Sequence, residues 1–140
     1  MPSRGRRRAF TALVLALGIG FVLAALAIAI AGLYDEKAIL MPPGAPAARG
    51  RASIRTFLAS DMAASKTVGA VFHLGAKPDG GVNGDMGWAS GTYSVTDTSG
   101  KIIDNGKYLS VSKKEGGKWL YVRDTWNSDV AAPAEASSPP

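Results

Sequence analysis

The stretch from Ile102 to Trp126, IIDNGKYLSVSKKEGGKWLYVRDTW, carries the clearest structural pattern in this 140-residue chain. Apolar and polar side chains alternate on both sides of a short glycine turn, Glu115-Gly116-Gly117, which is the pattern of an antiparallel hairpin. The same period of two predicts strands near residues 68–77 and 87–97, joined by a loop at 78–81. About four strands in series predict a curved antiparallel meander.

Residues 49–64, upstream of the strands, have a helical period instead. Ile54, Phe57, Leu58 and Met62 follow one another at spacings of three, one and four, which gives one apolar stripe along an amphipathic helix. We therefore predict an α+β fold, with helix 49–64 packed on one face of the sheet.

The N-terminal region is apolar over a length that can cross a membrane. Residues 9–33 are 25 consecutive residues without a charge, from Ala9 to Leu33, and they follow a leader, residues 1–8, that holds four arginines. About 20 helical residues span the roughly 30 Å of a bilayer core, so we expect one membrane-length helix. The arginines place the leader in the cytoplasm and residues 34–129 outside it. A cleaved signal peptide is the alternative, with cleavage near Ala29 or Ala31 and a secreted or periplasmic product.

Composition narrows the function classes. The charge of +5 falls to +1 once the four leader arginines are set aside, and no basic stripe remains to follow a phosphate backbone, so we expect no nucleic-acid partner. The chain has no cysteine and one histidine, which argues against a disulfide framework and against a metal site. We expect no cofactor. Residues 130–140 are mainly Ala, Ser and Pro, and we expect a disordered tail.

Several short motifs together resemble one known family. In order and spacing they look like the SnoaL-like, ketosteroid-isomerase-like branch of the nuclear transport factor 2 superfamily, over residues 33–129. The motifs are Leu33 to Gly44, Arg49 to Arg55, Ser90 to Tyr93, Gly106 to Leu109 and Gly117 to Ser128. The resemblance implies a cone: a strongly bent antiparallel sheet that encloses an apolar pocket, often in a dimer formed through the outer face of the sheet.

The chain lacks both catalytic carboxyl groups of the ketosteroid isomerases in that family. By the resemblance, the general-base Asp of ketosteroid isomerases, next to the proline after a Leu-Tyr helix, is replaced by Pro42. The oxyanion-stabilising Asp falls on Leu109. Steroid isomerisation by that mechanism is therefore not expected, since acid–base transfer needs a titratable group at the reacting carbon. Members also begin with two helices, where this chain has its apolar run.

Strand parity supplies the candidate site residues. If the last strand turns Trp126 into the cone, Val122 and Asp124 point inward with it, and a buried carboxyl would have a raised pKa. The alternative pairs Asp124 with Arg123 or with nearby backbone amides. His73 is a candidate proton shuttle facing Asp124, or a structural histidine. The expected ligand-binding residues are Trp88, Ser90, Thr92, Ser94, Leu109, Val111, Val122 and Trp126.

The strand near 87–97 can also have the opposite orientation, with its two faces exchanged. In that interpretation Tyr93 and Val95 form core, and Ser90, Thr92 and Ser94 face water. Parity therefore leaves the lining of the pocket undecided between two sets of side chains.

Three functions follow from these patterns. The first is a membrane-tethered or exported domain that binds a small, largely apolar molecule, with no reaction assigned. The second is an isomerase, cyclase or hydratase that uses Asp124 for proton transfer. The third is a homodimerisation or assembly module that pairs through the outer sheet face, with contacts from Tyr93, Val95, Tyr108 and Tyr121.

Overall fold

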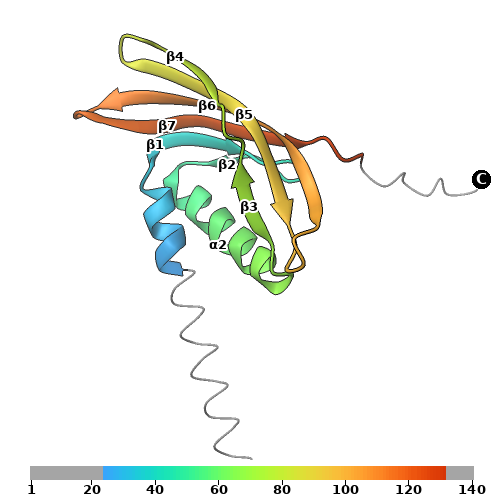
Figure 1. The fold of residues 1–140 in the computed structure, drawn as a ribbon. Helices are drawn as coiled ribbons and strands as arrows, with labels where there is room; N and C mark the ends of the chain where they lie inside the picture. The colour runs from blue at the N-terminus through green and yellow to red at the C-terminus, as the bar shows by residue number, and fades with distance from the viewer. Residues whose placement is uncertain (1–23, 132–140) are drawn as a thin grey trace, which may run out of the picture.

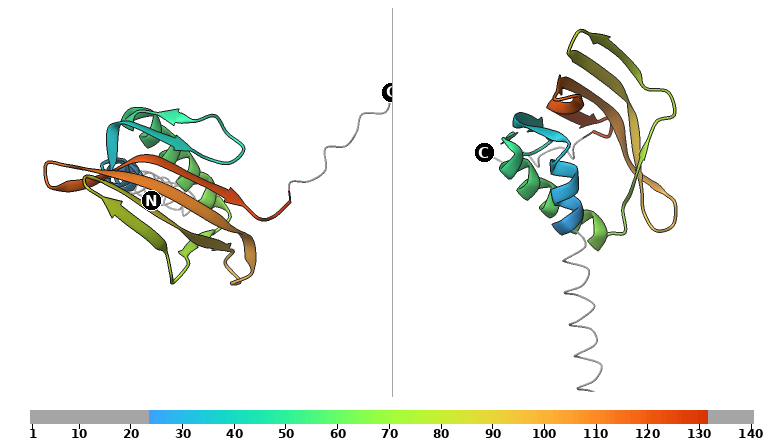
Figure 2. Two further views of the ribbon diagram at one scale, coloured as in Figure 1. Left: turned by 90° about the horizontal axis from the view of Figure 1, so that it is seen from above. Right: turned by 90° about the vertical axis from the view of Figure 1, so that its left-hand side faces the viewer.

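A computed structural model describes residues 24–131 of the chain. They form an α+β fold in which one strongly curved sheet wraps partly around two helices on its inner side (Figures 1 and 2). The sheet contains β1 (Tyr34–Met41), β2 (Ala48–Arg49), β3 (Val71–Leu74), β4 (Asp79–Asn83), β5 (Met86–Thr96), β6 (Ile102–Glu115) and β7 (Lys118–Ser128). Helix α2 (Arg51–Thr67) lies between β2 and β3 in the chain.

The strands lie in the order β2-β1-β7-β6-β5-β3, and β4 also pairs with β5. All of these pairs are antiparallel except β1 with β7, which is parallel. The hairpin between β6 and β7 turns at Gly116 and Gly117, whose φ angles of 56° and 78° are accessible mainly to glycine. The hairpin read from residues 102–126 is therefore confirmed.

Strands β3 and β4 together form one interrupted edge. β3 pairs with residues 93–96 of β5, and β4 pairs with residues 86–90 of the same strand. Gly75 still donates its backbone N–H to the carbonyl of Thr92, 2.8 Å away, before Pro78 separates the two pieces. β3 and β4 thus act as one edge strand that is interrupted between its two segments.

The sheet is larger than the sequence indicated. Residues 34–41, where no strand was predicted, form β1 through pairing with β7 and β2. Residues 79–83 form β4 where a loop was expected at 78–81. A side chain at Gly80 would lie 2.7 Å from the carbonyl oxygen of Trp88, so glycine permits the close approach of this edge.

The helix predicted over 49–64 is observed as α2, displaced slightly because residues 48–49 form β2. Its apolar stripe packs on β1 and β7. Ile54 is fully buried, and Phe57, Leu58 and Trp126 pack around the core cluster, which consists of Tyr34, Ala38, Leu40, Ala48 and Ile54. The core therefore lies under the β1–β7 half of the sheet.

The helix before β1 is described over residues 24–31. Ala27 and Ala31 are 0% and 2% exposed, and Ile30 packs against the core cluster, so this helix belongs to the domain. Within residues 24–131 no helix is both long and apolar enough to cross a membrane. The leader, most of the apolar run and residues 132–140 of the expected tail lie outside the described residues.

We expect Ile54→Ala to lower the free energy of unfolding by about 2–5 kcal/mol, because it leaves a cavity where a buried side chain joins α2 to β1. Urea unfolding of the full chain in detergent micelles measures the change. Ser60→Ala, on the exposed side of the same helix, is the control and should stay within about 0.5 kcal/mol of the parent. Equal effects of the two changes would contradict this account of the core.

Candidate functional site

The strand register fixes which side chains face the helices. Trp126 of β7 lies with its ring centroid 6.2 Å from that of Phe57 on α2, so Trp126 marks the inner face. Trp126 pairs with Tyr108 of β6, and Tyr108 pairs with Gly91 of β5. Directly paired residues in antiparallel strands share a face. The inner face of β5 therefore carries Ala89, Gly91, Tyr93 and Val95.

An acid and two tyrosines meet on this inner face. Asp124 pairs with Ser110, which is 7% exposed, and the hydroxyl of Tyr34 donates a 2.5 Å hydrogen bond to Oδ2 of Asp124. The ring of Tyr121 lies 5.3 Å from that of Tyr34. Parallel pairing of β1 with β7 makes this contact between residues 90 positions apart. We call Tyr34, Ser110, Tyr121 and Asp124 the acid cluster.

A β-bulge brings Tyr121 into the cluster. Val111 pairs with Arg123 but Ser112 pairs with Tyr121, so Val122 is an extra residue with no partner in β6. Each such insertion reverses the parity of the strand beyond it. Strict alternation from Trp126 predicts Val122 on the inner face and Tyr121 on the outer face, and the bulge puts Tyr121 inside instead.

Burial controls the ionisation of this cluster. Burial raises the pKa of Asp124, while hydrogen bonds from Tyr34 and from the backbone N–H of Thr125 act in the opposite direction. Burial, followed by the negative charge of Asp124, raises the pKa of Tyr34 far above its ordinary value. Tyr34 is therefore a permanent hydrogen-bond donor, and Asp124 is a carboxyl that takes up a proton more readily than one in water.

Beyond the acid cluster the inner face is an aromatic wall. The rings of Phe72 and Tyr93 stack with centroids 5.1 Å apart, and the hydroxyl of Tyr93 donates to Asp104 over 3.1 Å. Burial and this hydrogen bond raise the pKa of Tyr93 to about 12. Phe72 and Leu74 are 56% and 65% exposed although they lie on the inner face, so the β3–β5 half is not covered by the described helices (Figure 2).

The expected ligand-binding residues divide between the two faces. Trp126 lies inside, as parity predicted, and so does the candidate catalytic residue Asp124, while Val122 is the unpaired residue of the bulge. Six others lie on the outer face, so the predicted orientation was wrong for Trp88, Ser90, Thr92, Ser94, Leu109 and Val111. The opposite parity, with Tyr93 and Val95 turned toward the helices, is the observed one. The expected dimer contacts Tyr93, Val95, Tyr108 and Tyr121 are correspondingly all on the inner face.

His73 does not meet Asp124. It pairs with Ser94 of β5 on the outer face, and its Nε2 lies 3.0 Å from Oγ1 of Thr96. The predicted proton shuttle between His73 and Asp124 is therefore wrong, and the structural alternative describes this histidine. Leu109 is also on the outer face, and the inner positions beside it hold a tyrosine and a serine.

Sequence reasoning missed Tyr34 as the partner of Asp124. Tyr34 was visible only as part of the motif that begins at Leu33, and no local pattern shows that this motif lies against the last strand. The signal that could have found it is a tyrosine at the start of a strand that pairs in parallel with β7. That pairing is a long-range feature.

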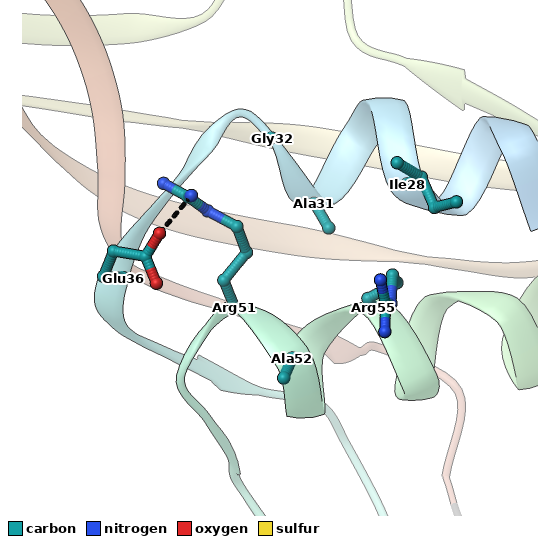
Figure 3. Close-up of a pocket in the computed structure, with 7 residues that line it drawn as sticks. All are labelled: Ile28, Ala31, Gly32, Glu36, Arg51, Ala52 and Arg55. Carbon is teal, nitrogen blue, oxygen red and sulfur yellow. Dashed lines mark hydrogen bonds and ion pairs between the residues drawn. The ribbon is translucent and has the colours of Figure 1, made fainter.

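A separate hollow of about 350 Å³ lies between the helix at 24–31 and the first turn of α2 (Figure 3). Arg51 donates through Nε to the carbonyl of Tyr34 over 2.9 Å and forms an ion pair with Glu36, so this arginine holds α2 to the start of β1. No member of the acid cluster lines the hollow, whose walls are Ile28, Ala31, Gly32, Glu36, Arg51, Ala52 and Arg55. The hollow is therefore separate from the acid cluster.

In the part of the chain that the structure describes, no group of three or more His, Asp or Glu side chains is placed to hold a metal ion. The carboxyl of Asp124 is bound by Tyr34 instead.

The fold is similar to that of many solved structures. It superposes on a nuclear transport factor 2-like protein with a cystatin-like fold from Novosphingobium aromaticivorans with a TM-score of 0.68, at 20% identity over 96% of this chain and 95% of that one. A ketosteroid isomerase-like protein from Erwinia carotovora gives a TM-score of 0.56 at 17% identity, over 86% and 96% of the two chains. A protein from Catenulispora acidiphila in complex with S-DNPA gives 0.61 at 16% identity, over 85% and 95%.

These structures confirm the resemblance at the level of the fold: the chain has the nuclear transport factor 2-like, cystatin-like architecture. The sequence matches no protein-family model and no curated protein. Identities of 20% or less say nothing about which chemistry this copy of the fold carries.

We expect Asp124→Asn to change how stability depends on pH. Because burial raises the pKa of Asp124, the folded state binds the proton more tightly than the unfolded state. Stability of the parent protein should therefore fall as pH rises from about 4 through the raised pKa of the folded state. The variant lacks that group, so its stability relative to the parent should increase over the same window.

Urea unfolding at a series of pH values between about 3.5 and 8 measures this difference. Asp85→Asn, at an exposed turn, is the matched control and should keep the trend of the parent. A constant difference between Asp124→Asn and the parent at all pH values would show that burial does not govern this carboxyl.

Proposed function

We propose that the domain binds a small, largely apolar molecule against the inner face of the sheet, with Asp124 and Tyr34 as its polar contacts. The observation that carries the proposal is a carboxyl group held by a tyrosine hydroxyl in an aromatic environment. Apolar walls with a few convergent polar groups are typical of small-molecule sites.

The chemistry of the acid cluster narrows the ligand class. A carboxylate accepts up to about four hydrogen bonds, and those from Tyr34 and Thr125 leave capacity for another donor. A ligand hydroxyl or N–H can use that capacity, whereas a ligand anion would be repelled. We therefore favour a neutral, mostly aromatic or alicyclic molecule with one donor group.

The exposed aromatic wall supports this proposal. Phe72 and Leu74 leave apolar surface uncovered on the same face as the acid cluster, and Tyr93 stacks beneath Phe72. Covering this surface with an apolar ligand would be favourable by about 25 cal/mol for each Å² removed from water.

We further propose that the apolar run keeps the domain at a membrane. Cleavage near Ala29 or Ala31 would remove most of the helix at 24–31, which packs through Ala27 and Ile30 on the domain. That packing favours a retained anchor over a cleaved signal peptide. In this arrangement the leader is cytoplasmic and the domain lies outside the cytoplasm.

The retained anchor is tested by intact-mass measurement of protein extracted from membranes. We expect the mass of the uncleaved chain, and resistance to extraction at alkaline pH. A mature product that begins after Ala29 or Ala31 and is released in soluble form would contradict the anchor.

A proton-transfer enzyme is the alternative supported by the raised pKa of Asp124. In that case Asp124 is the general base and Tyr34 fixes its orientation, without His73. The inner positions of β6 next to Leu109 hold no carboxyl, so the steroid isomerase arrangement is not part of this alternative.

An assembly role is supported by the outer face instead. Trp88 and Leu109 are 44% and 45% exposed, and their strands are adjacent in the sheet. A second copy would cover these side chains, in place of the tyrosines expected from the sequence. This role is compatible with ligand binding on the inner face.

Binding of 2-naphthol, a neutral aromatic ring with one hydroxyl donor, tests the proposed function. We expect its fluorescence to titrate saturably with the full-length protein in micelles. Asp124→Asn and Tyr34→Phe should weaken binding by roughly tenfold or more, since a hydrogen bond to a charged group contributes about 1.5–3 kcal/mol.

Thr92→Val, on the outer face of β5, is the matched control and should bind like the parent. Equal affinity of all four proteins would place naphthol away from the acid cluster and refute the proposal. Binding at 100 times the dissociation constant should also raise the free energy of unfolding by about 2.7 kcal/mol.

A further inference from the structure

One end of the domain carries exposed apolar side chains from two loops. Val68 and Val71 flank the connection from α2 to β3, and Ile102 follows the turn between β5 and β6; they are 59%, 51% and 59% exposed. The two loops touch, because a Cβ atom at Gly69 would lie 2.3 Å from Cγ2 of Thr98. We call Lys66, Val68, Val71, Lys101 and Ile102 the apolar end.

The charges of the apolar end are mainly positive. Lys66 lies in the last turn of α2, and Lys101 precedes Ile102. The nearby carboxylate of Asp97 is held within its own turn, where it accepts hydrogen bonds from the hydroxyl of Ser99 over 2.6 Å and from two backbone N–H groups. Exposed valine and isoleucine side chains beside lysines suit the interface of a bilayer, where apolar groups meet acyl chains and lysines meet anionic headgroups.

The chain leaves the domain at this same end. The described helix begins at residue 24, at the same end of the domain as the C-terminal end of α2 and the β5–β6 turn, as both side views show (Figures 1 and 2). Ala27 and Ala31 of this helix face the domain, while Leu26 and Ile28 are 47% and 56% exposed. The exposed surface of this helix is thus apolar.

Helix length sets how far the domain stands from the bilayer. The helix at 24–31 is packed on the domain, so residues 9–23 are the part of the apolar run that remains, 15 residues in all. The helix expected from their sequence would span about 22 Å at 1.5 Å per residue, roughly 8 Å less than a bilayer core. About five further residues, 24–28, would then be needed at membrane depth, which would bring the loops at the same end of the domain to the lipid headgroups.

We propose that the apolar end rests in the interfacial region of the bilayer that holds the anchor. The inference depends on the proposed membrane anchor and adds to it a fixed contact between lipid and the folded domain. Val68, Val71 and Ile102 lie among the upper acyl chains, and Lys66 and Lys101 lie at the phosphates.

Single-cysteine labelling of the full-length protein in vesicles of phosphatidylcholine and phosphatidylglycerol tests this contact. The chain has no cysteine, so each variant carries one site for an environment-sensitive nitrobenzoxadiazole label. Val71→Cys and Ile102→Cys report the apolar end. Val82→Cys, 69% exposed on β4 at the opposite end, is the matched control, and Leu17→Cys reports the apolar run.

We expect the labels at positions 71 and 102 to emit at shorter wavelength than the label at position 82. They should be quenched by nitroxide lipids, and the label at 82 by iodide in the buffer. Labels at 71 and 102 that iodide quenches as well as it does at 82 would overturn the inference, as would labels shielded from both quenchers, which would mean that a second copy covers this end.

The label at position 17 separates the two possible failures. Quenching at 17 by deep nitroxide lipids, with labels at 71 and 102 exposed to iodide, would refute the interfacial contact and leave the anchor intact. Loss of lipid quenching at 17 would refute the anchor and the contact together.

Discussion

The parallel pairing of β1 with β7 is the contact on which the arrangement of the domain depends. It brings Tyr34 to Asp124, and it places Ala38 and Leu40 where α2 can cover them. The cluster that we propose as a binding site and the hydrophobic core are therefore built from the same strand pair. A change that loosens β1 would act on stability and on ligand binding together, which is why outer-face and helix-surface controls are needed to separate the two.

The local sequence pattern was sufficient to predict the C-terminal meander and α2. Alternation and glycine turns specify hairpins between neighbouring strands, and the helical stripe through Ile54 specifies one packed face. β1 was missed because its partner lies about 90 residues away, so that only the tertiary pairing makes it a strand. β4 was missed because its glycines indicate a loop unless the close approach of β5 is known.

The site shows a second limit of sequence reasoning. Asp124 and Trp126 were placed on the inner face because no irregularity separates them. One inserted residue, Val122, then put Tyr121 on that face as well. For β5 the sequence allowed two orientations. The expected pocket took the one in which the hydroxyl groups of β5 face inward, and the structure has the other. Tyr93 faces inward because a tyrosine buries more apolar surface there than a serine could.

The interrupted edge formed by β3 and β4 bears on how this protein avoids unwanted association. Exposed strand edges are templates to which other chains can add, and long uninterrupted ones are the most hazardous. On this side the edge is divided into pieces of 4 and 5 residues, and on the other side β2 has 2 residues. Neither edge offers an incoming strand a long ladder of backbone hydrogen bonds. Crowding of many copies would therefore carry little risk of amyloid-like stacking, even with apolar side chains exposed on both faces of the sheet.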